Sequence, residues 1–256
     1  MTADEQNEEM WRQILTGTEP TLVRWRQIAK RIPSEPRCKM CATPFRGVGG
    51  LAARLIGHAP MPRNPLLCRA CNGTLVKHPG GAQIDVSVLF ADVRGSTHLA
   101  EDVSAVEFRD LLQGFYAAAR AAITAHDGIL DKFLGDGVMA LFIPAFAGEA
   151  FAARGIEAGR ALLRALATSP EPRLPVGVGI HNGLAYVGVV GGGDDPDFSA
   201  LGDVVNVAAR LGSQAAAGEL LVSADAARAG GLTVDKDSLQ TIEIAGREQP
   251  LQVLSL

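Results

Sequence analysis

Two aspartates lie where an ionised side chain is costly unless a ligand balances its charge. Asp92 ends the apolar run VSVLFADV, and Asp136 occupies the tip of a predicted hairpin, FLGDGVMALF. Each aspartate alone has a structural explanation, because Asp often caps a helix after a strand and Gly-Asp-Gly is a common turn. A strand end and a hairpin tip can also bring two carboxylates together, which predicts a site for a hard divalent cation such as Mg²⁺ or Mn²⁺.

A second set of metal-binding residues lies near the amino terminus. It consists of all the cysteines of the chain, in two Cys-x-x-Cys pairs separated by 26 residues: Cys38, Cys41, Cys68 and Cys71. This spacing is typical of structural zinc sites, in which four thiolates complete a tetrahedron. The same thiolates can hold an iron–sulfur cluster, and four reduced thiols in a loop are the alternative to any metal. His58 and His78 are possible substitute ligands, although a surface position is the commoner one for each.

The composition is that of a globular protein with one good core and an additional module. The chain has 256 residues, 47% of them hydrophobic and 20% charged, with a net charge of -4. That balance does not suggest nucleic-acid binding, and we interpret the locally basic segment from Arg24 to Arg69 as a solvated face. No apolar run is long enough to cross a bilayer, and the acidic start is unlike a secretory signal. We therefore expect a cytoplasmic protein with no membrane partner.

Composition also divides the chain into three parts. Residues 1–32 predict two short amphipathic helices, interrupted around Gly17 and Pro20. Residues 33–80 are rich in Pro, Gly and Arg and lack periodicity, which predicts a small irregular module held by the cysteines. A nearly continuous apolar strand, covered on both faces, is expected from Ile84. We place a boundary at Gly80-Gly81 and a third domain at 82–256.

The third domain alternates between strand and helix patterns. Helices are expected at 104–125 and about 147–167, and a short one in DVVNVAARLG. Strands are expected in the hairpin around Asp136, in a pair formed by PVGVGIHNG and LAYVGVVG, and in the closing segments GELLVS, LQTIEI and PLQVLSL. This order predicts an α+β fold with an antiparallel sheet and helices packed on one side.

Four blocks of this domain resemble, in order, those of bacterial-type class III adenylyl and guanylyl (nucleotidyl) cyclases. The blocks are FADVRGSTHLAE, KFLGDGVMALF, GIHNGLAYVGVVG and FSALGDVVNVAARL, within about residues 84 to 256. The resemblance implies a ferredoxin-like sheet and a homodimer whose active sites are shared across the interface. It also implies a phosphorus–oxygen lyase for signal transduction, an adenylate cyclase that converts ATP to 3′,5′-cyclic AMP and pyrophosphate.

By this resemblance, Asp92, Asp136 and the backbone carbonyl of Val93 hold two Mg²⁺ or Mn²⁺ ions in each active site. The ions would acidify the ATP 3′-hydroxyl and neutralise the leaving pyrophosphate. The following turn would offer backbone N–H groups to the triphosphate at a helix N-terminus. That turn comprises Arg94, Gly95, Ser96 and Thr97.

The resemblance assigns base recognition to Lys132 and Ser199. An ammonium only donates hydrogen bonds, and adenine N1 accepts one whereas guanine N1 carries a hydrogen, so Lys132 favours ATP. Ser199 would accept a hydrogen bond from the adenine 6-amino group. The alternative for Lys132 is an exposed strand lysine, and the alternative activity is guanylyl cyclisation.

Asn206 and Arg210 are four residues apart and so share one face of the predicted helix. The resemblance implies that Asn206 orients the ribose and that Arg210 stabilises charge on the α-phosphoryl group. Leu184 and Ala245 occupy places where the family often has phosphate-binding cations, and Arg247 is the candidate replacement. These departures leave a second alternative, a catalytically silent nucleotide-binding regulator. In either case, the cysteine module is expected to regulate how two such domains meet.

Overall fold

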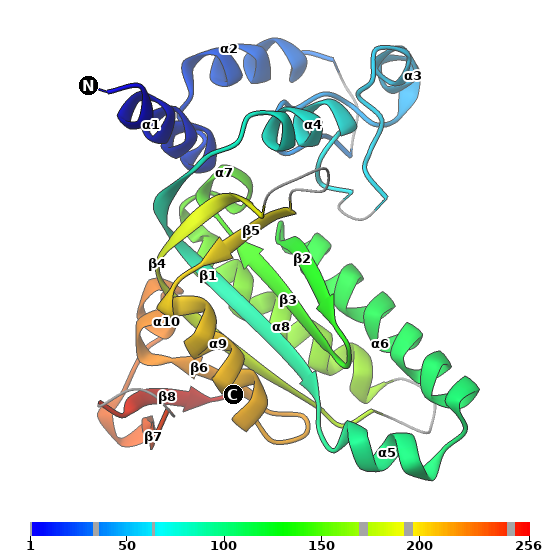
Figure 1. The fold of residues 1–256 in the computed structure, drawn as a ribbon, viewed down its shortest axis with the longest axis vertical. Helices are drawn as coiled ribbons and strands as arrows, with labels where there is room; N and C mark the ends of the chain where they lie inside the picture. The colour runs from blue at the N-terminus through cyan, green and yellow to red at the C-terminus, as the bar shows by residue number, and fades with distance from the viewer. Residues whose placement is uncertain (1, 33–35, 63–64, 169–173, 192–196, 245–248) are drawn as a thin grey trace.

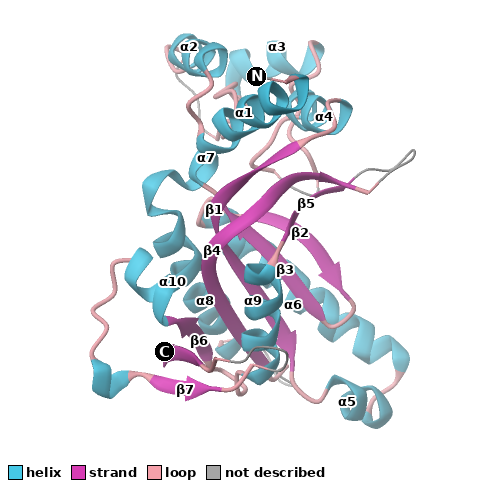
Figure 2. Cartoon of the chain, turned by 60° about the vertical axis from the view of Figure 1, so that its left-hand side comes forward, coloured by secondary structure: helices cyan, strands magenta, loops and turns pink. Residues whose placement is uncertain are grey.

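The computed structural model describes residues 2–32, 36–62, 65–168, 174–191, 197–244 and 249–256. Four helices form one end of the molecule, above the sheet in Figure 1 and in Figure 2: α1 (Ala3–Thr16), α2 (Pro20–Ala29), α3 (Gly47–Leu55) and α4 (Arg69–Lys77). The two helices predicted before residue 32 are confirmed. The prediction of an irregular segment after residue 33 misses α3 and α4. Cys68 caps the start of α4, and its sulfur accepts a hydrogen bond from the Cys71 N–H, so a cysteine pair marks where this helix begins.

An eight-stranded sheet forms the body of the molecule. Its order is β2-β3-β1-β4-β6-β8-β7, and β5 pairs with β4. All pairs are antiparallel except β4 with β6. The strands are β1 (Gly81–Val93), β2 (Ile129–Leu134), β3 (Gly137–Phe142), β4 (Val176–Val190), β5 (Asp197–Leu201), β6 (Leu220–Ser223), β7 (Gln240–Ile242) and β8 (Leu251–Ser255).

The remaining helices cover both faces of this sheet. They are α5 (Ser96–Asp102), α6 (Ala105–Ala125), α7 (Pro144–Ala147), α8 (Phe151–Ala167), α9 (Asp203–Gln214) and α10 (Ala224–Ala229), with short 3-10 turns η1 (Gly148–Ala150) and η2 (Lys236–Ser238). In Figure 1, α6 and α8 lie behind the sheet and α9 lies in front. The α+β fold is confirmed, but the prediction that its helices pack on one side is wrong.

Alternation along β1 explains the two-sided packing. Leu89 and Ala91 belong to the core beneath α6 and α8, whereas Val86 and Val88 belong to the core shared with α9 and the amino-terminal helices. Successive side chains of a strand point to opposite faces. The continuous apolar run of β1 therefore serves two cores, as its sequence predicted.

Strand β4 corrects a second expectation. The sequence PVGVGIHNGLAYVGVVG predicted two strands, but Val176–Val190 is one strand paired with the whole of β1. Gly183 lies inside this ladder, opposite Val86. The long pairing with β1 overrides the Asn-Gly turn signal, because a turn there would leave the central strand unpaired.

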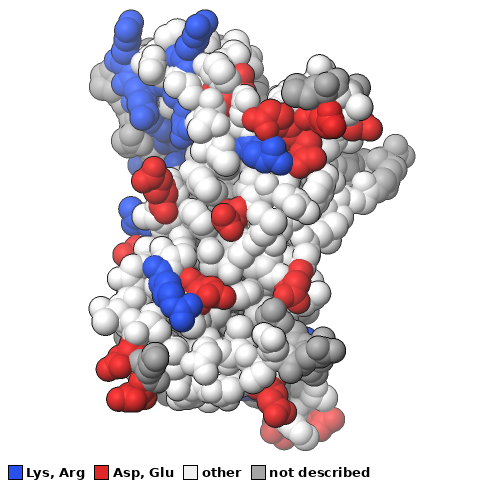
Figure 3. All heavy atoms as spheres, turned by 90° about the vertical axis from the view of Figure 1, so that its left-hand side faces the viewer, with Lys and Arg blue, Asp and Glu red and all other residues white. Residues whose placement is uncertain are grey.

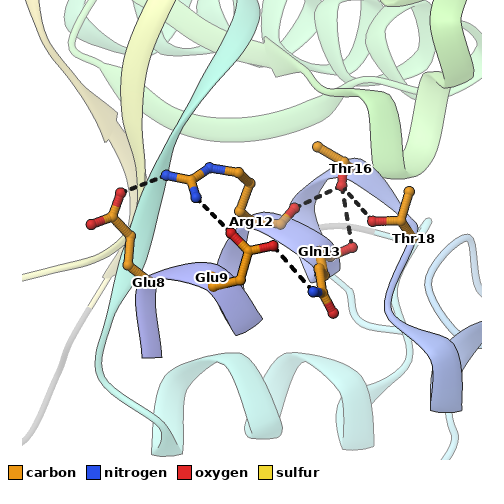
Figure 4. Close-up of polar contacts among 6 residues, drawn as sticks. All are labelled: Glu8, Glu9, Arg12, Gln13, Thr16 and Thr18. Carbon is orange, nitrogen blue, oxygen red and sulfur yellow. Dashed lines mark hydrogen bonds and ion pairs between the residues drawn. The ribbon is translucent and has the colours of Figure 1, made fainter. Parts of the chain in front are cut away.

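Helix α1 joins the amino-terminal end to the sheet. Its inner side buries Trp11 and Leu15, and the Trp11 ring stacks on Phe198 of β5 with centroids 6.4 Å apart. Polar groups along the helix bond to one another, as Figure 4 shows: Arg12 reaches Glu8 and Glu9, each at 2.7 Å, and Gln13 reaches Glu9 at 3.1 Å. Exposed pairs of this kind contribute little, so the buried side of α1 determines how the helix sits on the sheet.

Charged side chains are unevenly distributed over the amino-terminal end. Figure 3 shows Lys and Arg gathered at one corner of that end and Asp and Glu at another. Arg24, Lys30, Arg31, Arg46 and Arg54 are all exposed, in agreement with a solvated basic face. Among the described residues, no helix is both long and apolar enough to span a membrane.

Candidate active site

The two predicted metal-binding aspartates lie next to each other in the sheet. Asp92, near the end of β1, pairs in register with Gly137, which follows Asp136 at the β2–β3 turn. The Val93 N–H donates to the Asp136 carbonyl at 3.2 Å, so the strand end and the hairpin tip are held together by the backbone. The Asp92 side chain is 31% exposed. Half-buried carboxylate oxygens beside backbone carbonyls fit the ligand preference of Mg²⁺ or Mn²⁺.

Arg94 is the cation that meets these carboxylates. Its guanidinium pairs with Asp92 and donates to the Ser213 carbonyl at the end of α9. Burial lowers the pKa of Arg94, and the charge of Asp136 opposes that shift. The backbone N–H of Arg94, which the sequence assigned to the triphosphate, donates instead to the Pro175 carbonyl at 2.6 Å.

The predicted phosphate-binding turn leads into α5. Gly95 has a φ of 65°, the left-handed region that glycine enters without strain, and Ser96 and Thr97 are the first residues of the helix. Backbone N–H groups in a first turn have no partner within the helix. Ser96 is half-buried and Thr97 is exposed, so solvent reaches this turn.

The predicted base-recognising pair is in direct contact. Lys132 of β2 and Ser199 of β5 are far apart in the sequence, yet the Lys132 Nζ lies 3.1 Å from the Ser199 Oγ. Carboxylates surround the ammonium: Asp131 and Asp197 each have an oxygen 3.6 Å from Nζ. The Lys132 side chain remains 31% exposed, so its N–H groups are accessible to a ligand.

Helix α9 presents the predicted Asn206 and Arg210 to the outside. Val204, Val207, Ala208 and Leu211 bury the inner face of the helix, while both polar residues are exposed. A Cβ at Gly179 would overlap the backbone nitrogen of Gly212, so glycines let α9 lie directly on β4. Within the described part of the chain, neither the Asn206 nor the Arg210 side chain makes a hydrogen bond or ion pair.

The triphosphate-binding cation is the least supported part of the predicted site. Leu184 is 59% exposed on β4, an apolar side chain where a phosphate-binding cation was sought. Ala245 and the candidate replacement Arg247 lie outside the described residues.

The four cysteines converge on one buried point. Cys38, Cys41, Cys68 and Cys71 are all buried and form no disulfide, and their Sγ atoms lie within 4.8 Å of one another. Backbone N–H groups support the sulfurs: Cys68 N–H donates to Cys38 Sγ at 3.3 Å, and Cys71 N–H to Cys68 Sγ at 3.4 Å. Hydrogen bonds, first with the Cys38 thiol, hold the pKa of Cys41 well below its usual range. A tetrahedral metal ion fits this donor set.

The predicted substitute ligands have different positions. His58 lies at the edge of the cluster, with Nδ1 3.2 Å from Cys68 Sγ and 3.8 Å from Cys41 Sγ. His78 is exposed at the end of α4. Four cysteines are enough for a tetrahedral site, so His58 is a neighbour of the sulfurs and not a required ligand.

Comparison with known proteins decides the family. Residues 81–254 match the family described as the Adenylate and Guanylate cyclase catalytic domain. The chain belongs to this family. The class III resemblance seen in four sequence blocks is thereby confirmed, and the sheet with its two aspartates is a cyclase catalytic domain.

Curated relatives align with this cyclase domain. An adenylate cyclase of Anabaena cylindrica is 35% identical over 140 residues, which cover 49% of this chain and 26% of the relative. An uncharacterized protein of Mycobacterium tuberculosis is 31% identical over 178 residues, which cover 68% of this chain and 33% of the relative. The alignments thus span only about a quarter to a third of these longer relatives.

Solved structures share the cyclase fold. The crystal structure of a guanylyl cyclase superposes with a TM-score of 0.65 at 26% identity, covering 69% of this chain and 93% of the other. The adenylyl cyclase CyaB from P. aeruginosa superposes with a TM-score of 0.59 at 28% identity, covering 69% and 95%. Both nucleotide specificities therefore occur among structures similar to this domain.

Sequence reasoning missed two residues beside the cyclase site. The Tyr116 hydroxyl on α6 donates to the Gly135 carbonyl, and burial, then the charge of Asp136, raise the pKa of Tyr116. The other is Asp131, only 3% exposed. A carboxylate inside the apolar strand ILDKFL could have indicated Asp131, but only the adjacent Lys132 in that strand was assigned a role.

Proposed function

We propose that this chain is an adenylyl cyclase, which converts ATP to 3′,5′-cyclic AMP and pyrophosphate at active sites shared by two copies of the chain. The observation that carries the choice of ATP is the contact between Lys132 and Ser199. The ammonium can donate a hydrogen bond to N1 of adenine, which is an acceptor. N1 of guanine carries a hydrogen, so two donors would face each other there. The Ser199 hydroxyl can accept from the 6-amino group.

Asp92, Asp136 and the carbonyl of Val93 would hold the two divalent cations. When bound, Mg²⁺ or Mn²⁺ would acidify the 3′-hydroxyl and neutralise the pyrophosphate. The residues of the chain supply orientation and charge. Asn206 would position the ribose, and Arg210 would stabilise the negative charge that develops on the α-phosphoryl group.

The exposed face of α9 supports a shared site. Asn206 and Arg210 project outward, where a second copy can bring its aspartates to them. In a symmetric dimer each copy then contributes the same residues to two equivalent sites. The aspartates of one copy would act with Lys132, Ser199, Asn206 and Arg210 of the other.

Guanylyl cyclisation is the second candidate. The guanylyl cyclase with a TM-score of 0.65 favours it, whereas the Lys132–Ser199 contact opposes it. When ATP and GTP are offered together at equal concentration, we expect cyclic AMP to exceed cyclic GMP by at least about tenfold. The reason is that each polar group left unpaired in a buried contact costs about 1 kcal/mol or more. Quantifying both products by mass spectrometry checks this preference. A product mixture dominated by cyclic GMP would reverse the assignment of the base site.

We also propose that the four cysteines bind a single zinc ion. Thiolates about 2.3 Å from one ion are separated by about 3.8 Å in a tetrahedron, and the Cys41 and Cys68 Sγ atoms are 3.8 Å apart. A polynuclear iron–sulfur cluster places several atoms between its thiolates and so separates them further. The zinc ion would hold α4, which packs against β4 and β5, and could thereby regulate the strand that contains Ser199.

Replacing Cys68 with Ser is expected to remove the bound metal and to lower the midpoint of thermal unfolding by about 10 °C, because the metal contributes directly to folding. The native protein should contain one zinc per chain and show no absorption band in the visible region. Metal analysis and differential scanning calorimetry measure both effects, with the exposed His78→Ala as the matched control. Stoichiometric iron and sulfide in protein purified without oxygen would contradict the zinc assignment.

A further inference from the structure

A buried carboxylate lies behind the proposed base-recognising pair. Asp131 precedes Lys132 on β2, and its side chain is completely buried. Asp131 Oδ2 lies 2.6 Å from Ser199 Oγ, and Asp131 Oδ1 lies 3.6 Å from Lys132 Nζ. Ser199 itself is only 3% exposed. The three side chains therefore form one connected polar group at the base site.

The direction of each hydrogen bond in this group follows from the chemistry of its members. The Lys132 ammonium has N–H donors only, so Ser199 Oγ must be the acceptor at 3.1 Å. The single hydroxyl hydrogen of Ser199 then needs another partner. The Asp131 carboxylate at 2.6 Å supplies it, at the short distance typical of an O–H donor bonded to an ionised oxygen. One lone pair of Ser199 Oγ remains for a ligand.

Asp131 is a costly residue for a strand interior. Burial raises the pKa of its carboxyl, and the Ser199 hydroxyl and the Lys132 charge act against that rise. A buried carboxylate costs folding free energy that an apolar side chain would not. Stabilisation of β2 therefore does not explain Asp131, whereas control of its two polar neighbours does.

We propose that Asp131 is a positioning residue for base specificity: by taking the Ser199 hydrogen, it makes Ser199 an obligate acceptor toward the base. An acceptor pairs with the 6-amino group of adenine and opposes the 6-oxo group of guanine. The inference rests on the proposed function, in which Lys132 and Ser199 meet the base.

The test compares ATP with the triphosphate of purine riboside, which lacks the 6-amino group but keeps N1 as an acceptor. For the native enzyme we expect kcat/KM to be about tenfold higher with ATP, the value of one hydrogen bond. In Asp131→Asn, the amide can donate to Ser199 and reverse its hydroxyl, so this ratio should fall to about 1 to 3. Turnover of GTP relative to ATP should rise.

Two further variants separate positioning from folding. Asp131→Ala frees the Ser199 hydroxyl to donate, so it should lower the same ratio even if Asp131→Asn does not fold. In a Ser199→Ala background, Asp131→Asn should leave the ratio unchanged. A merely structural role would reduce turnover of both nucleotides equally and keep the ratio.

The outcomes are distinct. A native ratio near tenfold that falls in the Asp131 variants supports the inference. A ratio that persists in both variants, or a native ratio near 1, overturns it while leaving the cyclase activity in place. Absence of cyclic AMP from the native enzyme would instead be a failure of the proposed function.

Discussion

Asp92→Ala is expected to lower the rate of cyclic AMP formation by about 1000-fold, because loss of a metal ligand removes about 4 kcal/mol of transition-state stabilisation. The fold should survive, since the Asp92 side chain is partly exposed and pairs only with Arg94 among the described charged groups. Initial rates of cyclic AMP release at saturating Mn²⁺ and ATP, together with circular dichroism, measure the two effects separately.

The matched control is Asp225→Ala on α10. Asp225 is also an aspartate in an ion pair, with Arg228, but its side chain is 60% or more exposed, and exposed pairs contribute little. We expect this variant to retain nearly full activity. Equal activity of Asp92→Ala and Asp225→Ala would contradict the assignment of Asp92 as a metal ligand.

Arg210→Ala is expected to lower the rate by about 100- to 1000-fold, the usual effect of removing a group that stabilises transition-state charge. The more informative result comes from combining it with Asp92→Ala. If each site takes its aspartates from one copy and α9 from the other, a mixed dimer contains one intact site. Random pairing of the two inactive variants should then restore about a quarter of native activity.

Two different affinity tags allow the mixed dimer to be isolated and assayed alone. The purified mixed dimer is expected to have half of the native activity. No single chain can account for that activity, because each chain in the dimer carries one of the two inactivating substitutions. A purified mixed dimer with no activity above its parents would show that Asp92 and Arg210 act from the same copy, and the shared site would have to be abandoned.

Sequence patterns predicted the fold where one interaction dominates. The apolar run of β1 indicated a strand covered on both faces, and the hairpin around Asp136 followed from its glycines. The two-strand interpretation of Val176–Val190 failed because a long partner strand outweighs a local Asn-Gly signal. Helix α3 was missed because three of its nine residues are glycine, a poor helix former, and α4 because its start is capped by a cysteine and not by one of the usual capping residues.

Candidate site residues could be proposed from the sequence where they lie in short ordered blocks. Asp92, Asp136, Lys132, Ser199, Asn206 and Arg210 are named as candidates from those blocks, and their roles stay predictions; the structure brings Lys132 into contact with Ser199. What the sequence could not give is orientation. The hydrogen-bond direction imposed by Asp131, and the pairing of Arg94 with Asp92, depend on side chains that meet only in the folded sheet.

The most direct test is to incubate the purified full chain with ATP and Mg²⁺ or Mn²⁺ and to quantify cyclic AMP and pyrophosphate. We expect both products to form in a one-to-one ratio, at rates at least about 1000-fold above those of Asp92→Ala. ATP consumption that yields ADP or AMP, or no cyclic AMP above the Asp92→Ala background with either metal, would contradict the assignment of this chain as an adenylyl cyclase.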